Sequence, residues 1–379
     1  MSNEAGERRT NGSALHGFRR RIPVAAHIGS YRDYTARVHR ATGEAGQGLR
    51  REEFVKSVFD WATDERQLLT AFEDLKRFGG PAPGIDGITY DDIPSVFVPS
   101  YARNLRDTLR TGRFTASDLR SVMIPKLSGN GLRELLLAII DDRVVGKAIL
   151  MAISPFLDAG FDEHSFGFRP GRDRLHALAH ALTVAQREGR WHWAVLDIQD
   201  AFPSVSRKRL EQILRKKLPN NRLCRVINQL SNNGRPKGIP QGQPLCPLLL
   251  NVYLDHTLDK QWRRLHPHTP LIRVADDLLI LSRDAQEAAA AIQTLKRLVN
   301  SAGMQLKGDY AQADKDLMNG EVAHWLGLRV RHDTEKAIVS LGEPCWRKLQ
   351  DRFKQVQTKA FPALAADAVL KGWFHSQGA

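Results

Sequence analysis

The stretch Leu271-Ile-Arg-Val-Ala-Asp-Asp-Leu-Leu-Ile-Leu281 decides the fold of this chain. Its two adjacent carboxylates, Asp276 and Asp277, stand between two apolar runs, a pattern typical of a tight β-hairpin with acid at its tip. Crowded carboxylates repel one another, so such a pair usually serves cations. A third acid, Asp197, comes late in the strand-like Trp193-Ala-Val-Leu-Asp-Ile198 and would complete a site for two Mg²⁺ ions.

The composition is ordinary for a globular protein except in its charge. Of the 379 residues, 42% are hydrophobic and 26% are charged, which fits a large core and two or three subdomains. The net charge of +14, however, indicates a polyanionic partner, of which nucleic acid is the commonest. The alternative is a merely basic, soluble protein.

The cysteines and the apolar runs bear on the compartment. Cys224, Cys246 and Cys345 lie far apart and match no metal-ligand spacing, which suits a reducing cytoplasm and argues against a disulfide framework. No apolar run reaches ~18 residues, so we expect no membrane span. The N-terminus also lacks the apolar core of a signal peptide. We therefore expect a cytoplasmic protein without a membrane partner.

The order of predicted elements indicates one sheet with helices. Residues 1–50 hold nine arginines, no lysine and four acids, and form either a floppy basic tail or an arm that orders on RNA. Beyond them, hydrophobic periodicity predicts helices at 52–78, 139–156, from about 206, at 288–302 and in the last 45 residues, and strands at 118–125, 193–198, 271–282 and 322–330. The order strand, helix, hairpin, helix, strand predicts an antiparallel sheet with helices on one face and with the acidic strand ends close together.

Six blocks then occur in a fixed order: Gly84-Ile-Asp-Gly-Ile-Thr89, Val122-Met-Ile-Pro-Lys126 through Arg133, His164-Ser-Phe-Gly-Phe-Arg-Pro-Gly-Arg172, Asp197-Ile-Gln-Asp-Ala-Phe202, Gly238-Ile-Pro-Gln-Gly-Gln-Pro-Leu-Cys-Pro-Leu248 and Val274-Ala-Asp-Asp277. With them, residues 80–335 resemble reverse transcriptases of the bacterial group II intron-like branch, which includes the unknown-group and phage-defence enzymes. The resemblance implies an α/β (α+β) right-hand polymerase with fingers, a ferredoxin-like palm and a short helical thumb.

The same resemblance implies a division into four parts. These are a basic N-terminal arm at 1–50, an N-terminal extension with the fingers at 51–190, a palm with the catalytic acids at 191–335, and a short helical thumb at 336–379. So short a thumb segment leaves no room for a separate DNA-binding module or an endonuclease with a Cys/His metal site. We therefore do not expect a self-sufficient mobile-intron protein.

The resemblance also assigns roles to the acids. Phosphoryl transfer builds charge on the attacking and leaving oxygens, and two metals about 4 Å apart can clamp both. Asp197 and Asp276 would be the bridging ligands, Asp277 a more loosely engaged acid, and Ile198 a ligand only through its backbone carbonyl. The ions would be Mg²⁺, with Mn²⁺ as a possible substitute. Taken singly, each acid could instead be a solvated turn residue.

Several residues match nucleotide-binding positions of the family. Phe202 would lie under the incoming sugar and favour dNTPs over rNTPs, unless it is only core packing. Lys126 and Arg133 face the same side of a fingers hairpin and would grip the triphosphate, although exposed basic residues are usually just solvated.

Three further residues complete this expected pocket. Gly242 permits close backbone approach, and the amide of Gln241 can hold a template base or the nucleotide sugar. Lys307 resembles the lysine near the leaving pyrophosphate, with Lys315 as a competitor for that role.

Two segments match positions that contact nucleic acid. Arg169 and Arg172 suit a loop against a phosphate backbone, or alternatively a salt-bridged structural turn. Trp325-Leu-Gly-Leu328, which includes Gly327, resembles the primer grip with Trp in place of the usual Phe. Val274 departs from the family because Tyr is usual there, which affects the expected primer positioning and fidelity but not metal binding.

The function expected from these residues is RNA-directed DNA polymerisation. The protein would use dNTPs to make a DNA product on a bound, structured noncoding RNA, and could act in anti-phage defence in a bacterial cytoplasm. A protein partner or a homo-oligomer is compatible with the sequence. One alternative is a maturase-like RNA-binding protein that does not polymerise. Another is a polymerase with untemplated or terminal-transferase activity, which the change at Val274 favours.

Overall fold

The computed structural model describes residues 48–125, 131–308, 310, 312–333, 336–358 and 361–377. Residues 1–47, which make up most of the basic arm expected at 1–50, and Lys126 therefore lie outside the described residues. The helices are α2 Gly48–Ala62, α3 Glu65–Phe78, α4 Val98–Arg110, α5 Ile140–Asp158, α6 Arg174–Glu188, α7 Ala201–Ser204, α8 Arg207–Lys217, α9 Asn221–Leu230, α10 Cys246–Leu254, α11 Lys260–Leu265, α12 Ala285–Ser301, α13 Glu343–Val356 and α14 Pro362–Gln377.

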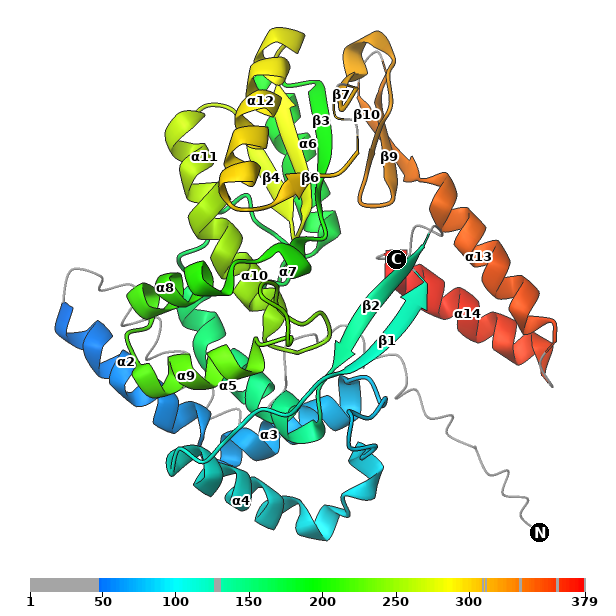
Figure 1. Ribbon diagram of the computed structural model, residues 1–379. Helices are drawn as coiled ribbons and strands as arrows, with labels where there is room; N and C mark the ends of the chain where they lie inside the picture. Colours follow the sequence, from blue (N-terminus) through cyan, green and yellow to red (C-terminus); the bar gives the residue numbers. More distant parts are fainter. Residues whose placement is uncertain are drawn as a thin grey trace, which may run out of the picture.

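The strands are β1 Arg120–Pro125, β2 Leu132–Leu137, β3 His192–Gln199, β4 Leu271–Val274, β5 Asp277–Ser282, β6 Gln305–Leu306, β7 Asp314–Asp316, β8 Ala323–Trp325, β9 Leu328–His332 and β10 Ala337–Leu341. In Figure 1 the sheet around β3 lies above a body of helices that includes α2 to α5, α8 and α9. The β1–β2 hairpin and the pair α13–α14 lie to one side of that body.

The main sheet has the order β4-β5-β3-β6, with β7 also pairing with β3, and its pairs are antiparallel. This confirms the expected antiparallel sheet with helices. The hairpin predicted at 271–282 is β4–β5, and the amphipathic helix predicted at 288–302 is α12. The helix expected from about Ser206 is α8, and the Ser206 side chain caps it by accepting a hydrogen bond from Arg209 N.

The single strand predicted at 322–330 is wrong. The segment forms the β8–β9 hairpin, whose turn residues Leu326 and Gly327 have φ values of 54° and 79°. With β10 this hairpin forms a separate three-stranded sheet, β10-β9-β8. The places beside β3 are taken instead by β6 and β7, which are two and three residues long and too short to produce a readable periodicity.

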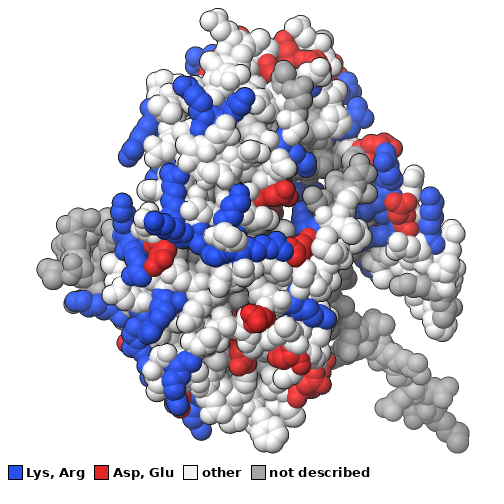
Figure 2. Space-filling model, in the orientation of Figure 1, with Lys and Arg blue, Asp and Glu red and all other residues white. Residues whose placement is uncertain are grey.

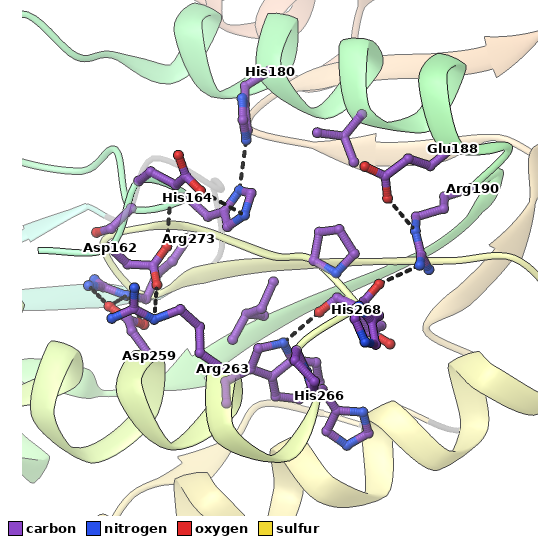
Figure 3. Close-up of a pocket in the computed structure, with 18 of the residues that line it drawn as sticks. Asp162, His164, His180, Glu188, Arg190, Asp259, Arg263, His266, His268 and Arg273 are labelled. Carbon is purple, nitrogen blue, oxygen red and sulfur yellow. Dashed lines mark hydrogen bonds and ion pairs between the residues drawn. The ribbon is translucent and has the colours of Figure 1, made fainter.

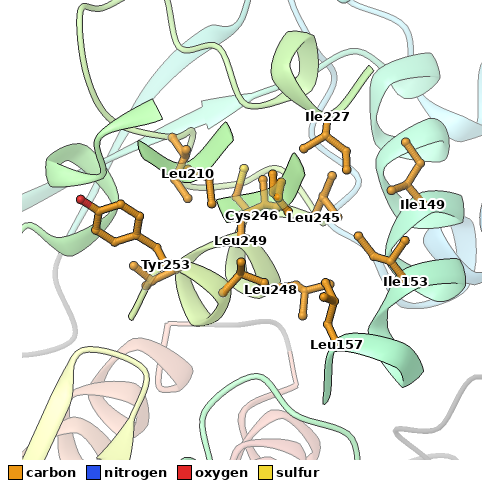
Figure 4. Close-up of a cluster of buried hydrophobic side chains, with 14 of the residues drawn as sticks. Ile149, Ile153, Leu157, Leu210, Ile227, Leu245, Cys246, Leu248, Leu249 and Tyr253 are labelled. Carbon is orange, nitrogen blue, oxygen red and sulfur yellow. The ribbon is translucent and has the colours of Figure 1, made fainter. Parts of the chain in front are cut away.

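Two hydrophobic cores lie on opposite faces of the main sheet. Alternation along β3 sends Ala194, Leu196 and Ile198 into the larger core and Trp193 into the smaller one. Helix α10 passes through the larger core, where residues of α5, α8 and α9 surround it (Figure 4). The smaller core contains residues of α6 and of β8–β9, so the expectation of helices on only one face is also wrong.

The β1–β2 hairpin has the form expected for the fingers, with Ile124 opposite Arg133 in antiparallel register. The expected boundaries between arm, fingers, palm and thumb stay predictions. The larger core contains residues from both sides of the expected boundary between fingers and palm at residue 190. Within the described residues, no helix is both long and apolar enough to cross a membrane.

Candidate active site

The three acids meet at one end of the central strand pair. Asp197 on β3 lies directly opposite Asp277 on β5, and Asp276 occupies the short turn between β4 and β5. The amide of Ile198 donates to the carbonyl oxygen of Asp276 at 3.1 Å, which ties this turn to β3. The Ile198 side chain is buried in the larger core, so only its backbone could serve a metal.

The environment of these acids disfavours their charged forms. Burial, and after it the neighbouring carboxylates of Asp276 and Asp197, together raise the pKa of Asp277 to about 7, with Lys307 opposing the shift. Burial also raises the pKa of Asp276, with Asp197 adding to the effect and Arg133 and Lys307 opposing it. Such crowded acids need a proton or a cation, and carboxylate oxygens are the ligands that Mg²⁺ prefers.

The carboxylates do not converge on a metal position as they stand. Among the described residues, no group of three or more His, Cys, Asp or Glu side chains is arranged to hold a metal ion. The Lys307 ammonium instead pairs with Asp197 Oδ2 at 3.0 Å. The donor set therefore has the chemistry of a Mg²⁺ site, while an ammonium group neutralises one of its members.

Lys307, and not Lys315, is the lysine beside the acids. Its backbone amide also donates to the carbonyl oxygen of Asp197 at 2.8 Å, which fixes the chain at this point. Lys315 lies opposite Trp193, several residues further from Asp197 along β3, and pairs with Glu321 at 3.3 Å. The pyrophosphate role of Lys307 stays a prediction.

The fingers hairpin and the Gln241-Gly242 loop are joined. The amide of Leu136 on β2 donates to the carbonyl oxygen of Gln241 at 2.8 Å. Gly242 has a φ of 129°, and a Cβ there would come within 2.9 Å of the Leu136 carbonyl oxygen. Glycine is therefore required here by the close approach of the loop to the fingers, and a contact of Gln241 or Gly242 with a nucleotide stays a prediction.

Phe202 lies beside the acids but is largely covered. It is only 7% exposed on α7, which follows β3 directly, and its ring meets the ring of Phe168 edge to face with the centroids 6.4 Å apart. Phe168 is 54% exposed. Sequence reasoning passed over Phe168, although it lies inside a quoted block, because a single aromatic residue in a loop carries no pattern.

The expectation that Arg169 contacts a phosphate backbone is not supported by its position. Its guanidinium is 8% exposed and is taken up by the Asp158 carboxylate at 2.7 Å and by the carbonyl oxygens of Asp162 and Ser165. Arg172 also donates to a carbonyl, that of Glu163, at 2.6 Å. In this loop the alternative of a salt-bridged structural turn describes Arg169 correctly.

The primer-grip expectation at Trp325 meets a similar correction. Trp325 is 1% exposed and belongs to the smaller core, so its ring is not available to a bound strand. Gly327 lies at the tip of the β8–β9 turn, where a Cβ would come within 3.2 Å of the Cys345 sulfur. If this turn holds nucleic acid, the contact is made by Gly327 and its backbone, and that role stays a prediction.

A buried polar network that the sequence did not predict holds the turn that carries Asp276 and Asp277. Arg273 donates to the Ala275 carbonyl oxygen at 3.0 Å and to Asn251 Oδ1 at 2.9 Å. Asp259 binds the same guanidinium through both of its carboxylate oxygens (Figure 3). Asn251 in turn donates to the Gly167 carbonyl oxygen at 2.6 Å. The sequence does carry one indication of this network, because Arg273 is a charged residue in an otherwise apolar strand. A charged side chain is seldom buried without a partner.

This network matters because the turn it holds is strained. Ala275 has a φ of 60°, which is uncommon for a residue with a Cβ. A Cβ at Gly167 would come within 2.2 Å of the Ala275 nitrogen, so the 164–172 loop presses directly on the turn. The orientation of Asp276 and Asp277 therefore depends on Arg273, Asn251 and Gly167.

A cavity of about 540 Å³ lies beside this network, and none of the acids Asp197, Asp276 and Asp277 lines it. His164 and His180 line it and share a hydrogen bond of 2.7 Å, and Arg263 pairs there with Asp162 at 2.8 Å (Figure 3). The charged groups of its wall largely neutralise one another. The three acids therefore lie at the hairpin tip, outside this cavity.

Basic side chains gather on the face shown in Figure 2, across the region of α8. The sequence of α8 contains six basic residues: Arg207, Lys208, Arg209, Arg215, Lys216 and Lys217. Such a surface attracts the phosphate backbone of a nucleic acid.

Comparison with known proteins gives a consistent family. A model described as reverse transcriptase (RNA-dependent DNA polymerase) matches residues 124–313. Protein YkfC of Escherichia coli (strain K12) is 29% identical over 196 residues, which is 48% of this chain and 50% of YkfC. Group II intron-encoded protein LtrA of Lactococcus lactis subsp. cremoris is 26% identical over 180 residues, 45% of this chain and 29% of LtrA.

Solved structures that match part of this chain include a partial Cas6-RT-Cas1–Cas2 complex, at 25% identity and a TM-score of 0.39, covering 64% of this chain and 42% of that one. Telomerase from Candida tropicalis with a fragment of telomeric RNA has 11% identity and a TM-score of 0.46, covering 73% and 57%. This chain spans half or less of the two curated relatives named above.

Proposed function

The chain belongs to the reverse transcriptase family, and from this premise we propose that it is an RNA-directed DNA polymerase. The observation that carries the proposal is the pairing of Asp197 with Asp277 across two strands, with Asp276 in the adjoining turn. A protein that only binds RNA gains nothing from buried, mutually repelling acids close to a polyanion. A site that gathers cations for phosphoryl transfer requires them.

The chain's own groups would divide the work as follows. Two Mg²⁺ ions, or Mn²⁺ in their place, would supply Lewis-acid stabilisation of the attacking and leaving oxygens when bound. Asp197, Asp276 and Asp277 would hold them, with Ile198 contributing its carbonyl. Lys307 would then leave Asp197 and place its ammonium against the charge that develops on the departing pyrophosphate.

The fingers would bind the triphosphate. Arg133 is close enough to Asp276 to lower the pKa of that acid, so its guanidinium can face both the carboxylates and a phosphate. We assign Lys126 the same role from its place in the sequence. Gln241 and Gly242, joined to β2, would carry the movement of the fingers to the nucleotide.

The template in this proposal is a bound, structured noncoding RNA. The net charge of +14 and the basic helix α8 suit a polyanion. One of the relatives is a group II intron-encoded protein. We propose anti-phage defence in a bacterial cytoplasm as the setting; all three cysteines are free, which is compatible with a reducing compartment. A protein partner or a second copy of the chain belongs to the same proposal.

The test is synthesis on the nucleic acid that the protein carries. The purified protein would receive Mg²⁺ and labelled dNTPs, beside an Asp276→Asn, Asp277→Asn double variant and an Asp91→Asn control, whose carboxylate is exposed and pairs with Lys76. We expect DNA complementary to the co-purified RNA from the wild type and the control, and none from the double variant.

The other outcomes separate the alternatives. DNA without a complementary RNA would indicate untemplated or terminal-transferase activity. A folded, RNA-loaded protein that makes no acid-dependent product would overturn the proposal in favour of a maturase-like RNA-binding protein.

A further inference from the structure

Phe168 is an exposed aromatic residue among buried neighbours. Phe166 and Arg169 are 6% and 8% exposed, whereas Phe168 is 54% exposed. A large apolar side chain in solvent needs no explanation by itself. Here, however, its backbone is also strained, since φ is 55° in a region that residues with a Cβ rarely occupy.

The strain is maintained by contacts on the preceding residue. The backbone of Gly167 presses on Ala275, and the Gly167 carbonyl oxygen accepts a hydrogen bond from the buried amide of Asn251. These contacts fix the direction in which the chain presents Phe168. Strain kept by the surrounding structure is characteristic of sites that bind or react.

The contacts of Phe168 and of Gly167 before it place Phe168 close to the acidic hairpin tip. Gly167 touches the turn that carries Asp276, and the ring of Phe168 packs edge to face on Phe202, which follows Asp197 by five residues. Because Phe202 is 7% exposed, Phe168 is the ring of this pair that a ligand would meet first.

We propose that Phe168 contacts the incoming nucleotide, with its exposed ring against the sugar and base, and that Phe202 supports it from below. The inference rests on the proposed polymerase function and refines it, because it moves the direct contact from Phe202 to Phe168. Aromatic rings stack on any base, so such a contact adds affinity without selecting a sequence.

The test compares steady-state kinetics of Phe168→Ala, Phe168→Leu, Phe168→Tyr and the wild type. We expect the dNTP KM to rise about tenfold for Ala and Leu, with a smaller change in kcat, and to stay within about twofold for Tyr. Met318→Ala is the control: Met318 is 59% exposed on the short helix Leu317–Asn319, next to the end of β7 that pairs with His192.

A Phe168→Gly variant separates binding from folding. Glycine tolerates the positive φ, so we expect this variant to unfold at the wild-type temperature or above it while its dNTP KM rises. A purely structural ring would instead lower the unfolding temperature and leave KM unchanged.

The outcomes also distinguish the two proposals. A folded wild type that makes no DNA would defeat the polymerase function itself. An active wild type whose Ala, Leu and Gly variants keep its dNTP KM would overturn the role of Phe168 alone. A rise in KM for the primer-template, without a rise for dNTP, would also overturn it, because the ring would then contact a strand.

Discussion

At the scale of single residues, the turn between β4 and β5 combines acids that repel one another with an unfavourable backbone conformation at Ala275. In the buried Arg273–Asp259 pair, Arg273 Nη2 lies 2.6 Å from Asp259 Oδ2. The same guanidinium supports the turn by donating to the Ala275 carbonyl oxygen. Buried pairs contribute little net stability, but removing one partner is costly. Their value here lies in fixing the direction of Asp276 and Asp277.

We expect Arg273→Lys to slow catalysis more than it weakens substrate binding. Lysine keeps the charge beside Asp259 but lacks the fork that reaches Asn251 and Ala275 together. The kcat should fall by about tenfold or more, since small misplacements of catalytic groups are expensive. Single-turnover kinetics would measure the rate of the chemical step, the dNTP KM would report substrate binding, and the unfolding temperature would report folding. An unchanged kcat would show that the turn keeps its conformation without the Arg273 guanidinium.

The pKa of Asp277 predicts how metal use depends on pH. With a folded pKa of about 7, above the ordinary value of 3.8, the acid is protonated below neutrality, and a proton competes with the metal. We expect the Mg²⁺ concentration for half-maximal synthesis to rise as the pH falls from about 8 to 6. In a chelator, which removes any bound metal, the free energy of unfolding should fall as the pH rises from about 4 to 7. Over this range the folded state holds a proton on Asp277 that the unfolded state has lost.

Asp277→Asn provides the comparison. Its unfolding free energy in chelator should lose part of this pH dependence, as measured by denaturant titration at several pH values. A stability profile identical to the wild type would mean that the carboxyl is not desolvated as its position implies.

At the scale of elements, long patterned segments were predictable and short or crowded ones were not. The hairpin at Asp276 and helix α12 followed from periodicity, because each buries one face. The β8–β9 turn was missed because Leu326 and Gly327 interrupt an apolar run without any of the usual polar turn residues. Arg169 and Trp325 were assigned to nucleic acid because sequence does not report burial, which depends on contacts with distant segments.

The junction between the fingers and the Gln241-Gly242 loop gives a prediction about a single glycine. Gly242→Ala would force a Cβ to within 2.9 Å of the Leu136 carbonyl oxygen at a φ of 129°, so the loop must separate from β2. We expect a loss of about 1–3 kcal/mol in unfolding free energy and a higher dNTP KM. Gly80→Ala is the matched control, because a Cβ there meets nothing within 4 Å. Equal behaviour of the two variants would contradict the junction.

At the scale of the whole molecule, the sheet separates two hydrophobic cores, and the acids lie near the C-terminal end of β3 and the start of β5. The sequence reveals the separation through alternation along β3, but not which helices cover each face. The surface charge is the other global property, and composition predicted its sign without its location. A basic exterior of this kind would attract the phosphate backbone of a nucleic acid.

That exterior predicts how RNA affinity responds to salt. Lys208 and Lys216 on α8 are exposed, so if this helix binds phosphates, replacing both with Ala should weaken RNA binding and reduce the slope of log affinity against log salt by about one to two. Filter binding across a salt series would measure it, with Lys315→Ala as the control because that ammonium pairs with Glu321. The slope falls only when a phosphate contact is lost, whereas misfolding lowers affinity at every salt concentration. An unchanged slope in a folded double variant would place the RNA on another face.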